Sequence, residues 1–122
     1  MLKKDESLRL ERIFQNTRVD NSSMFDLKFT KTADEQLRKI ENSPSKAGLC
    51  KQVKKSLGYL QVDPKHPSLN THSYDSIDHP WDMKEKVFEA YVQNNAPSAY
   101  RVFWCYGPDK KQITIIAITP HP

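Results

Sequence analysis

The residues of this chain that could perform chemistry on a phosphate gather in its C-terminal part. Arg101 lies among aromatic residues in the strand-like run Tyr100–Tyr106, and His121 follows the strand-like run Gln112–Ile118 after two residues. An arginine can hold a phosphate in a bidentate fork, and a histidine can act as a general acid or base near neutral pH. The pair therefore indicates phosphate chemistry, and the alternative for His121 is a frayed, solvated terminus.

Two further candidates, Glu89 and Tyr91, lie at alternate positions of the strand-like run 86–92. Directly opposed residues of an antiparallel pair point to the same side of a sheet, so a register that places Tyr91 opposite Arg101 also places Glu89 opposite Phe103. Glu89, Tyr91 and Arg101 would then share one open face, as proton acceptor, nucleotide-binding ring and phosphate ligand. The simpler interpretation is an exposed Glu–Arg ion pair, and a slip by one residue would separate the two side chains.

The segment 64–83 is rich in Pro, His, Ser and Asp and is predicted to be a long irregular loop. His72 could approach the open face from this loop, whereas His66 and His79 precede prolines and fit turns with exposed rings. The four histidines lack the spacing of metal ligands, and the two cysteines lie far apart without a Cys or His cluster. The sequence therefore predicts no metal site, no cofactor and reduced cysteines.

Positive charge is in modest excess. There are 19 Lys+Arg against 15 Asp+Glu, a net charge of +4 and a pI near 9.1, which fit an anionic partner such as a nucleic acid or an acidic protein segment. Lys51, Lys54 and Lys55 share one side of a predicted helix, where they could contact backbone phosphates or simply form a solvated face. Lys86, at the start of a predicted strand, is a further candidate for phosphate contacts.

Hydrophobic patterns divide the chain of 122 residues into an N-terminal arm and one domain. Residues 1–23, the arm, are mostly charged and polar, with Leu8, Leu10, Ile13 and Phe14 as an apolar cluster, and they are expected to be helical or disordered. Residues 24–122 have enough apolar side chains for a single modest core. No run approaches the about 20 apolar residues of a membrane span, so a soluble, cytoplasmic protein is expected.

The elements of the domain are expected in the order β-α-α-β-β-β. Residues 24–30 alternate as in a half-buried strand, and Thr32 with Glu35 matches a capping box that begins the first helix. A second set of apolar residues at helical spacing predicts a second helix. The expected strands are 24–30, 86–92, 100–106 and 112–118, and the helices lie between Thr32 and Asn42 and between Ser45 and Asp63.

The fold class that follows is α+β, with a four-stranded, mainly antiparallel sheet. The last three strands form an antiparallel meander, and the first strand adds at one edge because a helical hairpin separates it from the others. Both helices would cover one face of the sheet. The opposite face would remain open for the candidate residues.

Several segments together resemble the RelE/ParE superfamily of type II toxin–antitoxin toxins, over about residues 24 to 122. Among its branches, the likeness is to the YoeB and YafQ style of messenger-RNA interferase. There, a Pro-Leu-x-x-His-like segment precedes the active-site strand, and a His near the chain end joins it. The segments that carry the likeness are Leu49-Cys-Lys-Gln-Val-Lys-Lys-Ser-Leu-Gly-Tyr-Leu60, Pro67-Ser-Leu-Asn-Thr-His72, Ala99-Tyr-Arg-Val-Phe-Trp-Cys-Tyr106 and Ile115-Ile-Ala-Ile-Thr-Pro-His121-Pro122.

The resemblance implies a metal-independent endoribonuclease that inhibits translation by cleaving mRNA on the ribosome and is neutralised by a cognate antitoxin. It implies attack of a ribose 2′-OH on the adjacent phosphate. On this likeness Arg101 matches the arginine at the scissile phosphate, His121 the terminal catalytic histidine and His72 the loop position, with Glu89 a weaker candidate for the base. The lysines and Tyr91 would contact RNA.

Two departures keep other functions open. Pro122 stands where YoeB-like chains end in Tyr, so that role would fall to Tyr91 or another aromatic residue. RelE-like chains use several lysines with an arginine, whereas this chain offers Lys86 alone in the strand. The alternatives are a ParE-like inhibitor of DNA gyrase and a RelE-fold interaction module without catalytic activity.

Overall fold

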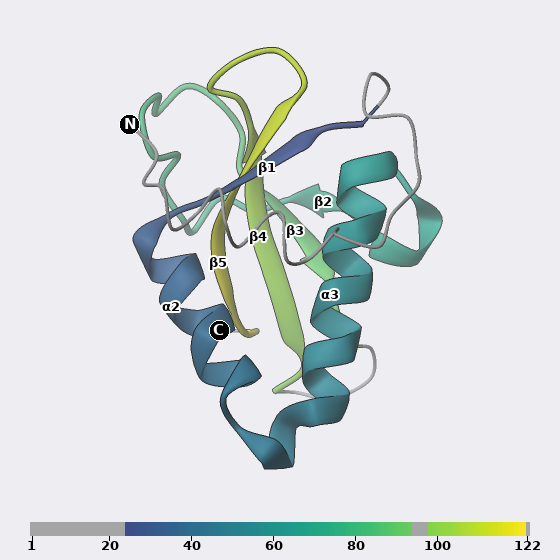
Figure 1. The fold of residues 1–122 in the computed structure, drawn as a ribbon. Coiled ribbons are helices and arrows are strands. Elements are labelled where there is room, and N and C mark those ends of the chain that lie inside the picture. The colour runs from purple at the N-terminus through teal and green to yellow at the C-terminus, as the bar shows by residue number, and fades with distance from the viewer. Residues whose placement is uncertain (1–23, 94–97, 122) are drawn as a thin grey trace.

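A five-stranded β-sheet with two α-helices on one of its faces makes up the fold (Figure 1). The structure is a computed structural model that describes residues 24–93 and 98–121, so the expectation for the arm lies outside the described residues. The helices are α2 (Lys31–Glu41) and α3 (Ala47–Val62), with 3₁₀ turns η2 (Pro44–Lys46) and η3 (Pro67–Leu69). The strands are β1 (Asp26–Phe29), β2 (His72–Ser73), β3 (Phe88–Tyr91), β4 (Tyr100–Tyr106) and β5 (Gln112–Pro120).

The sheet confirms the predicted α+β class and adds one strand to the predicted four. Its strand order is β1-β5-β4-β3-β2, with β1 parallel to β5 and the other neighbours antiparallel. The first strand thus joins at an edge, as expected. The additional strand is β2, in which His72 pairs with Glu89 and Ser73 with Phe88 inside the segment expected to be irregular. A two-residue strand has no periodicity of its own, so it is defined only by its partner.

The hydrophobic core lies between the sheet and the two helices. The apolar residues at helical spacing in the sequence form the buried face of each helix. These residues are Ala33, Leu37 and Ile40 in α2 and Val53, Leu57 and Leu60 in α3. In the described part of the chain, no helix is long and apolar enough to cross a membrane. The residues of the sheet that face this core are Leu27, Phe29, Ala90, Val102, Trp104, Ile113, Ile115 and Ile118.

Both cysteines are in the thiol form. Cys50 is half-buried and Cys105 is buried in β4. Burial raises the pKa of the Cys105 thiol to about 12, because the thiolate would lose its hydration there. Cys105 is therefore an unreactive core residue, since the thiolate is the nucleophilic form.

The first helix begins at a different threonine from the one predicted. Thr30 is the N-cap of α2, and its Oγ1 accepts a hydrogen bond from the backbone N–H of Ala33 at 3.1 Å. The same hydroxyl donates to the carbonyl of Ile116 in β5 at 2.7 Å. The prediction of a capping box at Thr32 was wrong, because Thr32 lies inside the helix. The sequence pattern could not reveal that β5 supplies a partner for Thr30.

Replacement of Thr30 by alanine should lower the free energy of unfolding by about 1 to 2 kcal/mol, since it removes the cap and the bond to β5. Thr32→Ala is the matched control, because Thr32 is exposed within α2 and alanine favours a helix. Urea unfolding of the two variants measures the difference. Equal stability of both would contradict the assignment of the cap.

Candidate active site

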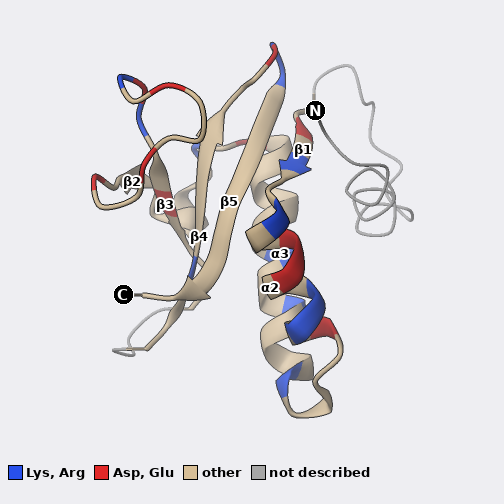
Figure 2. Ribbon diagram, turned by 90° about the vertical axis from the view of Figure 1, so that its left-hand side faces the viewer, with Lys and Arg blue, Asp and Glu red and all other residues tan. Residues whose placement is uncertain are grey.

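Side chains of four strands form rows across the face of the sheet that the helices leave uncovered. Figure 2 shows α2 and α3 on one side of the sheet and the C-terminal end of the described chain on the other. In one row His72 lies opposite Glu89, and Glu89 lies opposite Phe103; in the next, Tyr91 lies opposite Arg101. The register predicted for Glu89 and Tyr91 is therefore confirmed.

The centre of this face is the buried carboxylate of Glu89, whose side chain is 1% exposed. Nε2 of His72 lies 2.6 Å from its Oε1, and Nε2 of His121 lies 3.2 Å from its Oε2. Nε of Arg101 lies 3.7 Å from Oε2. These four residues, which we call the Glu89 cluster, are the four residues that the sequence proposed for catalysis. The structure brings all of them together.

The histidine from β2 is held at both ring nitrogens. Nδ1 of His72 lies 2.9 Å from the carbonyl oxygen of Asn70, which can only accept, so Nδ1 carries a hydrogen. Nε2 faces a carboxylate oxygen of Glu89, so a proton lies between these two atoms. The His72 side chain is nevertheless 49% exposed. His72 thus presents a proton-bearing imidazole to solvent.

The histidine near the chain end is tied to the sheet and does not form a frayed terminus. The backbone N–H of His121 donates to the carbonyl of Ala99 at 2.8 Å, which extends the pairing of β5 with β4. Its side chain is 40% exposed, and Nε2 lies within ion-pair distance of Oε2 of Glu89. However, Oε2 accepts no well-aligned hydrogen bond from any described residue.

Arg101 differs from the expectation of a phosphate ligand on an open surface. Its side chain is only 8% exposed, and Nη1 donates to the carbonyls of Gln93 at 2.6 Å and Tyr100 at 3.1 Å. The guanidinium carbon lies 3.8 Å from the ring centroid of Tyr91, which covers one side of it. Arg101 is buried between the ring of Tyr91 and the neighbouring side chains of the sheet, among them Glu89. Its geometry is that of a buried positive charge facing Glu89.

Sequence reasoning missed one aromatic residue of this face. The ring of Tyr74 packs on Phe103 with 4.8 Å between centroids and lies 6.3 Å from the ring of His121. The N–H of Tyr74 donates to the carbonyl of Val87, which continues the pairing of β2. Alternate residues of a strand share a face, so the spacing of two from His72 was the available signal. Tyr91, which was predicted, lies edge-on to His72 at 5.8 Å.

The candidate lysines are not part of the Glu89 cluster. Lys51, Lys54 and Lys55 lie on α3, in the helical layer that covers the opposite face of the sheet. Nζ of Lys54 is 3.3 Å from a carboxylate oxygen of Glu41, and Nζ of Lys55 lies 5.8 Å from the ring centroid of a neighbouring tyrosine. Lys86 is exposed and precedes β3. The chemistry of the site therefore depends on its two imidazoles and one carboxylate.

Solved structures of other proteins share this fold, although the sequence comparisons found no relative. No protein-family model matches the chain, and no curated protein matches it. A chain of the archaeal RelE–RelB complex from Pyrococcus horikoshii OT3 is similar, with 14% sequence identity and a TM-score of 0.53. The match covers 79% of this chain and 93% of that one. A YoeB/ParE toxin from Agrobacterium tumefaciens is similar with 8% identity and a TM-score of 0.57, over 79% of this chain and 98% of the toxin.

These likenesses define a class of small α+β proteins in which a helical hairpin covers one face of a mainly antiparallel sheet. More particularly, the chain has the fold of the RelE/ParE superfamily toxins. The resemblance inferred from the sequence is confirmed at the level of fold.

Proposed function

We propose that this protein is a toxin-type endoribonuclease that cleaves mRNA on the ribosome. The observation that carries the proposal is the contact of two half-exposed imidazoles, His72 and His121, with the two oxygens of one buried carboxylate. Cleavage of RNA by its own 2′-OH needs one group that accepts a proton and one that donates a proton. Two imidazoles on one face of a rigid sheet meet that need.

The proposed reaction moves two protons. A general base removes the proton of a ribose 2′-OH, and the 2′ oxygen forms a bond to the adjacent phosphorus. The bond from phosphorus to the 5′ oxygen breaks, and that oxygen takes a proton from a general acid. The products are a 2′,3′-cyclic phosphate and a 5′-OH end. Each of the two protons passes between the RNA and an imidazole.

The two histidines differ in a way that assigns them roles. His72 bears a hydrogen on Nδ1 and shares a proton with Glu89 at Nε2, so it is the proposed acid. His121, whose Nε2 lies 3.2 Å from the other oxygen of the same carboxylate, is the proposed base. For the transfer, a ring nitrogen of each histidine turns from its protein partner to the RNA, and the half-exposed side chains leave room for this.

Glu89 and Arg101 are proposed as positioning residues. The carboxylate is buried and orients both rings, and the guanidinium supplies the positive charge that compensates it. This assignment replaces the bidentate phosphate fork expected of Arg101. Tyr74 and Tyr91 flank the imidazoles and are proposed to stack on bases of the RNA.

The proposal includes a protein partner, an antitoxin that neutralises this protein. One of the similar structures is a complex of RelE with RelB. We expect an antitoxin segment to pack on this protein and to block or distort the open face that holds the Glu89 cluster.

The experiment that tests the mechanism uses ribosome-bound mRNA. The purified protein should cut the message, and primer extension gives the position. A second message with 2′-deoxyribose on the 5′ side of that position should resist cleavage there, because the attacking oxygen is absent. The same deoxy substitution two nucleotides away is the control. Cleavage at the original position in both messages would exclude attack by the 2′-OH.

Expression of the same protein in cells distinguishes the proposed endoribonuclease from the two alternative functions. Growth arrest on expression, with gyrase-linked DNA breaks and intact transcripts, would establish a ParE-like gyrase inhibitor. No arrest in the absence of any partner would favour an interaction module.

A further inference from the structure

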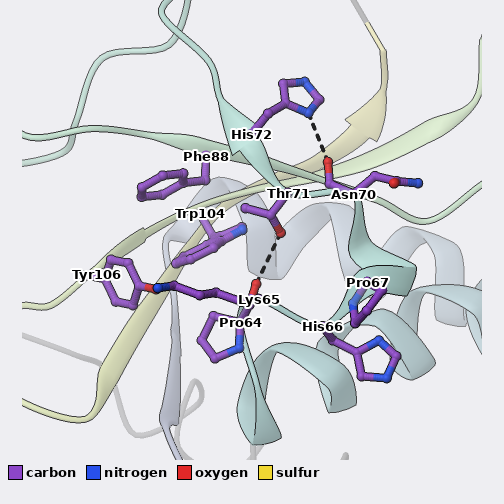
Figure 3. Close-up of a pocket in the computed structure, with 10 residues that line it drawn as sticks. All are labelled: Pro64, Lys65, His66, Pro67, Asn70, Thr71, His72, Phe88, Trp104 and Tyr106. Carbon is purple, nitrogen blue, oxygen red and sulfur yellow. Dashed lines mark hydrogen bonds between the residues drawn. The ribbon is translucent and has the colours of Figure 1, made fainter.

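A cavity of about 540 Å³ lies on the helical side of the sheet, near the edge formed by β2 (Figure 3). One wall is the segment from Pro64 to Thr71, which follows α3. The other wall is formed by the rings of Phe88, Trp104 and Tyr106. His72 of the Glu89 cluster also lines the cavity, and Figure 3 shows its ring directed away from Trp104.

The aromatic wall is continuous and contains one unsatisfied donor. Ring centroids of Phe88 and Trp104 are 4.8 Å apart, and those of Trp104 and Tyr106 are 4.9 Å apart. Nε1 of Trp104 is buried and has no hydrogen-bond partner among the described residues. Less than 1 Å² of this nitrogen is accessible, so it reports on the packing of the aromatic wall and does not offer a donor to a segment in the cavity.

Exposed apolar surface continues from the mouth of the cavity. The relative exposure of Val62, at the end of α3, is 58%, and that of Tyr106 is 43%. Burial raises the pKa of the Tyr106 phenol, and the negative charge of the nearby Asp63 raises it further. Large apolar side chains exposed together beside a cavity are typical of a surface that another segment covers.

The described chain begins at this surface. The ring of Phe25 packs on Tyr106 with 6.1 Å between centroids, and the N–H of Phe25 donates to the carbonyl of Gln61 at 2.9 Å. Residues 1–23 therefore enter the fold beside the cavity. The sequence of the arm contains an apolar cluster, Leu10, Ile13 and Phe14, at the spacing i, i+3 and i+4. Nine residues lie between Phe14 and Met24, and the ten steps from one to the other span up to about 33 Å when extended, so the cluster can reach the cavity.

We propose that the apolar cluster of the arm, residues 8–14, packs into this cavity against Phe88, Trp104 and Tyr106. The occupant is a segment of the same chain, because the arm combines apolar side chains with an attachment point at the mouth of the cavity.

The test follows the indole N–H of Trp104 by NMR in the full-length chain. The chain has two tryptophans, so the ¹H–¹⁵N spectrum holds two indole signals, and Trp81 serves as the internal reference. In the variant Ile13→Asp with Phe14→Asp, the Trp104 signal should shift, and its hydrogen exchange should accelerate by at least about tenfold as protection is lost. The matched control is Gln15→Asp with Asn16→Asp, which makes the same change of charge without removing apolar side chains.

Two results would overturn the proposal. The first is a Trp104 signal that is the same in wild type and in the Ile13→Asp, Phe14→Asp variant. The second is a Trp104 signal that shifts with protein concentration in the wild type, because the occupant would then belong to a second copy. Backbone signals of α2 report whether the variant stays folded. None of these readouts depends on RNA cleavage, so the inference stands or falls independently of the proposed function.

Discussion

Alanine at His121 should lower the rate of RNA cleavage by about 10² to 10⁴-fold, and alanine at His72 should do the same, because each change removes one proton-transfer group. The double variant should be little slower than either single variant, since groups that act in one step are not additive. Both side chains are about half exposed, so the fold should persist. Single-turnover cleavage of ribosome-bound mRNA measures the rates, and circular dichroism checks the fold.

His66→Ala is the control for the loss of an imidazole. The ring of His66 stacks on Tyr59 with 4.0 Å between centroids, and its Nδ1 accepts from the N–H of Ser68, away from the Glu89 cluster. Cleavage by this variant should match the wild type. Full activity of both His72→Ala and His121→Ala would refute the proposed roles, whatever the product ends are.

Glu89→Gln should be the most destabilising conservative change in the sheet. It keeps the shape of the side chain but removes the negative charge that faces Arg101, whose guanidinium then remains buried without compensation. Breaking a buried ion pair from one side costs about 3 kcal/mol or more of unfolding free energy. The loss of a carboxylate that orients both imidazoles should also reduce cleavage to the level of the histidine variants. Urea unfolding and the single-turnover assay provide the two measurements.

Glu41→Gln is the matched control for a charge removed from an ion pair. Its partner Lys54 is 40% exposed, so the pair is worth less than about 1 kcal/mol. Adding Arg101→Met to Glu89→Gln should restore part of the lost stability, because the uncompensated charge is gone. A Glu89→Gln variant as stable as Glu41→Gln would show that the Glu89 cluster has no structural role.

The sequence predicted the class of the fold and the central register because both depend on local periodicity. Alternation in two adjacent strands was enough to place Tyr91 opposite Arg101 and Glu89 opposite Phe103. The same alternation could not show how deeply a row is buried. Glu89 is covered by residues distant in the chain, His72 and His121, and Arg101 is covered by the ring of Tyr91.

The features that escaped prediction all depend on partners from elsewhere in the sheet. The cap of α2 is at Thr30 because that hydroxyl also reaches β5. The strand β2 exists because two residues of a loop find β3, and Tyr74 joins the site through the same pairing. No property of these residues within a short window distinguishes them from loop residues. Such contacts follow from the assembled sheet alone.

The parallel pairing of β1 with β5 joins the first and last strands of the described chain. Of the described strands a ribosome makes β1 first, and within the described residues β5 is its only strand neighbour, so β1 stays unpaired until β5 has been made. His121 follows β5. Under the proposed function, a nascent chain that stops short of β5 has neither a finished sheet nor a complete pair of imidazoles, so it cannot yet act on the ribosome that makes it.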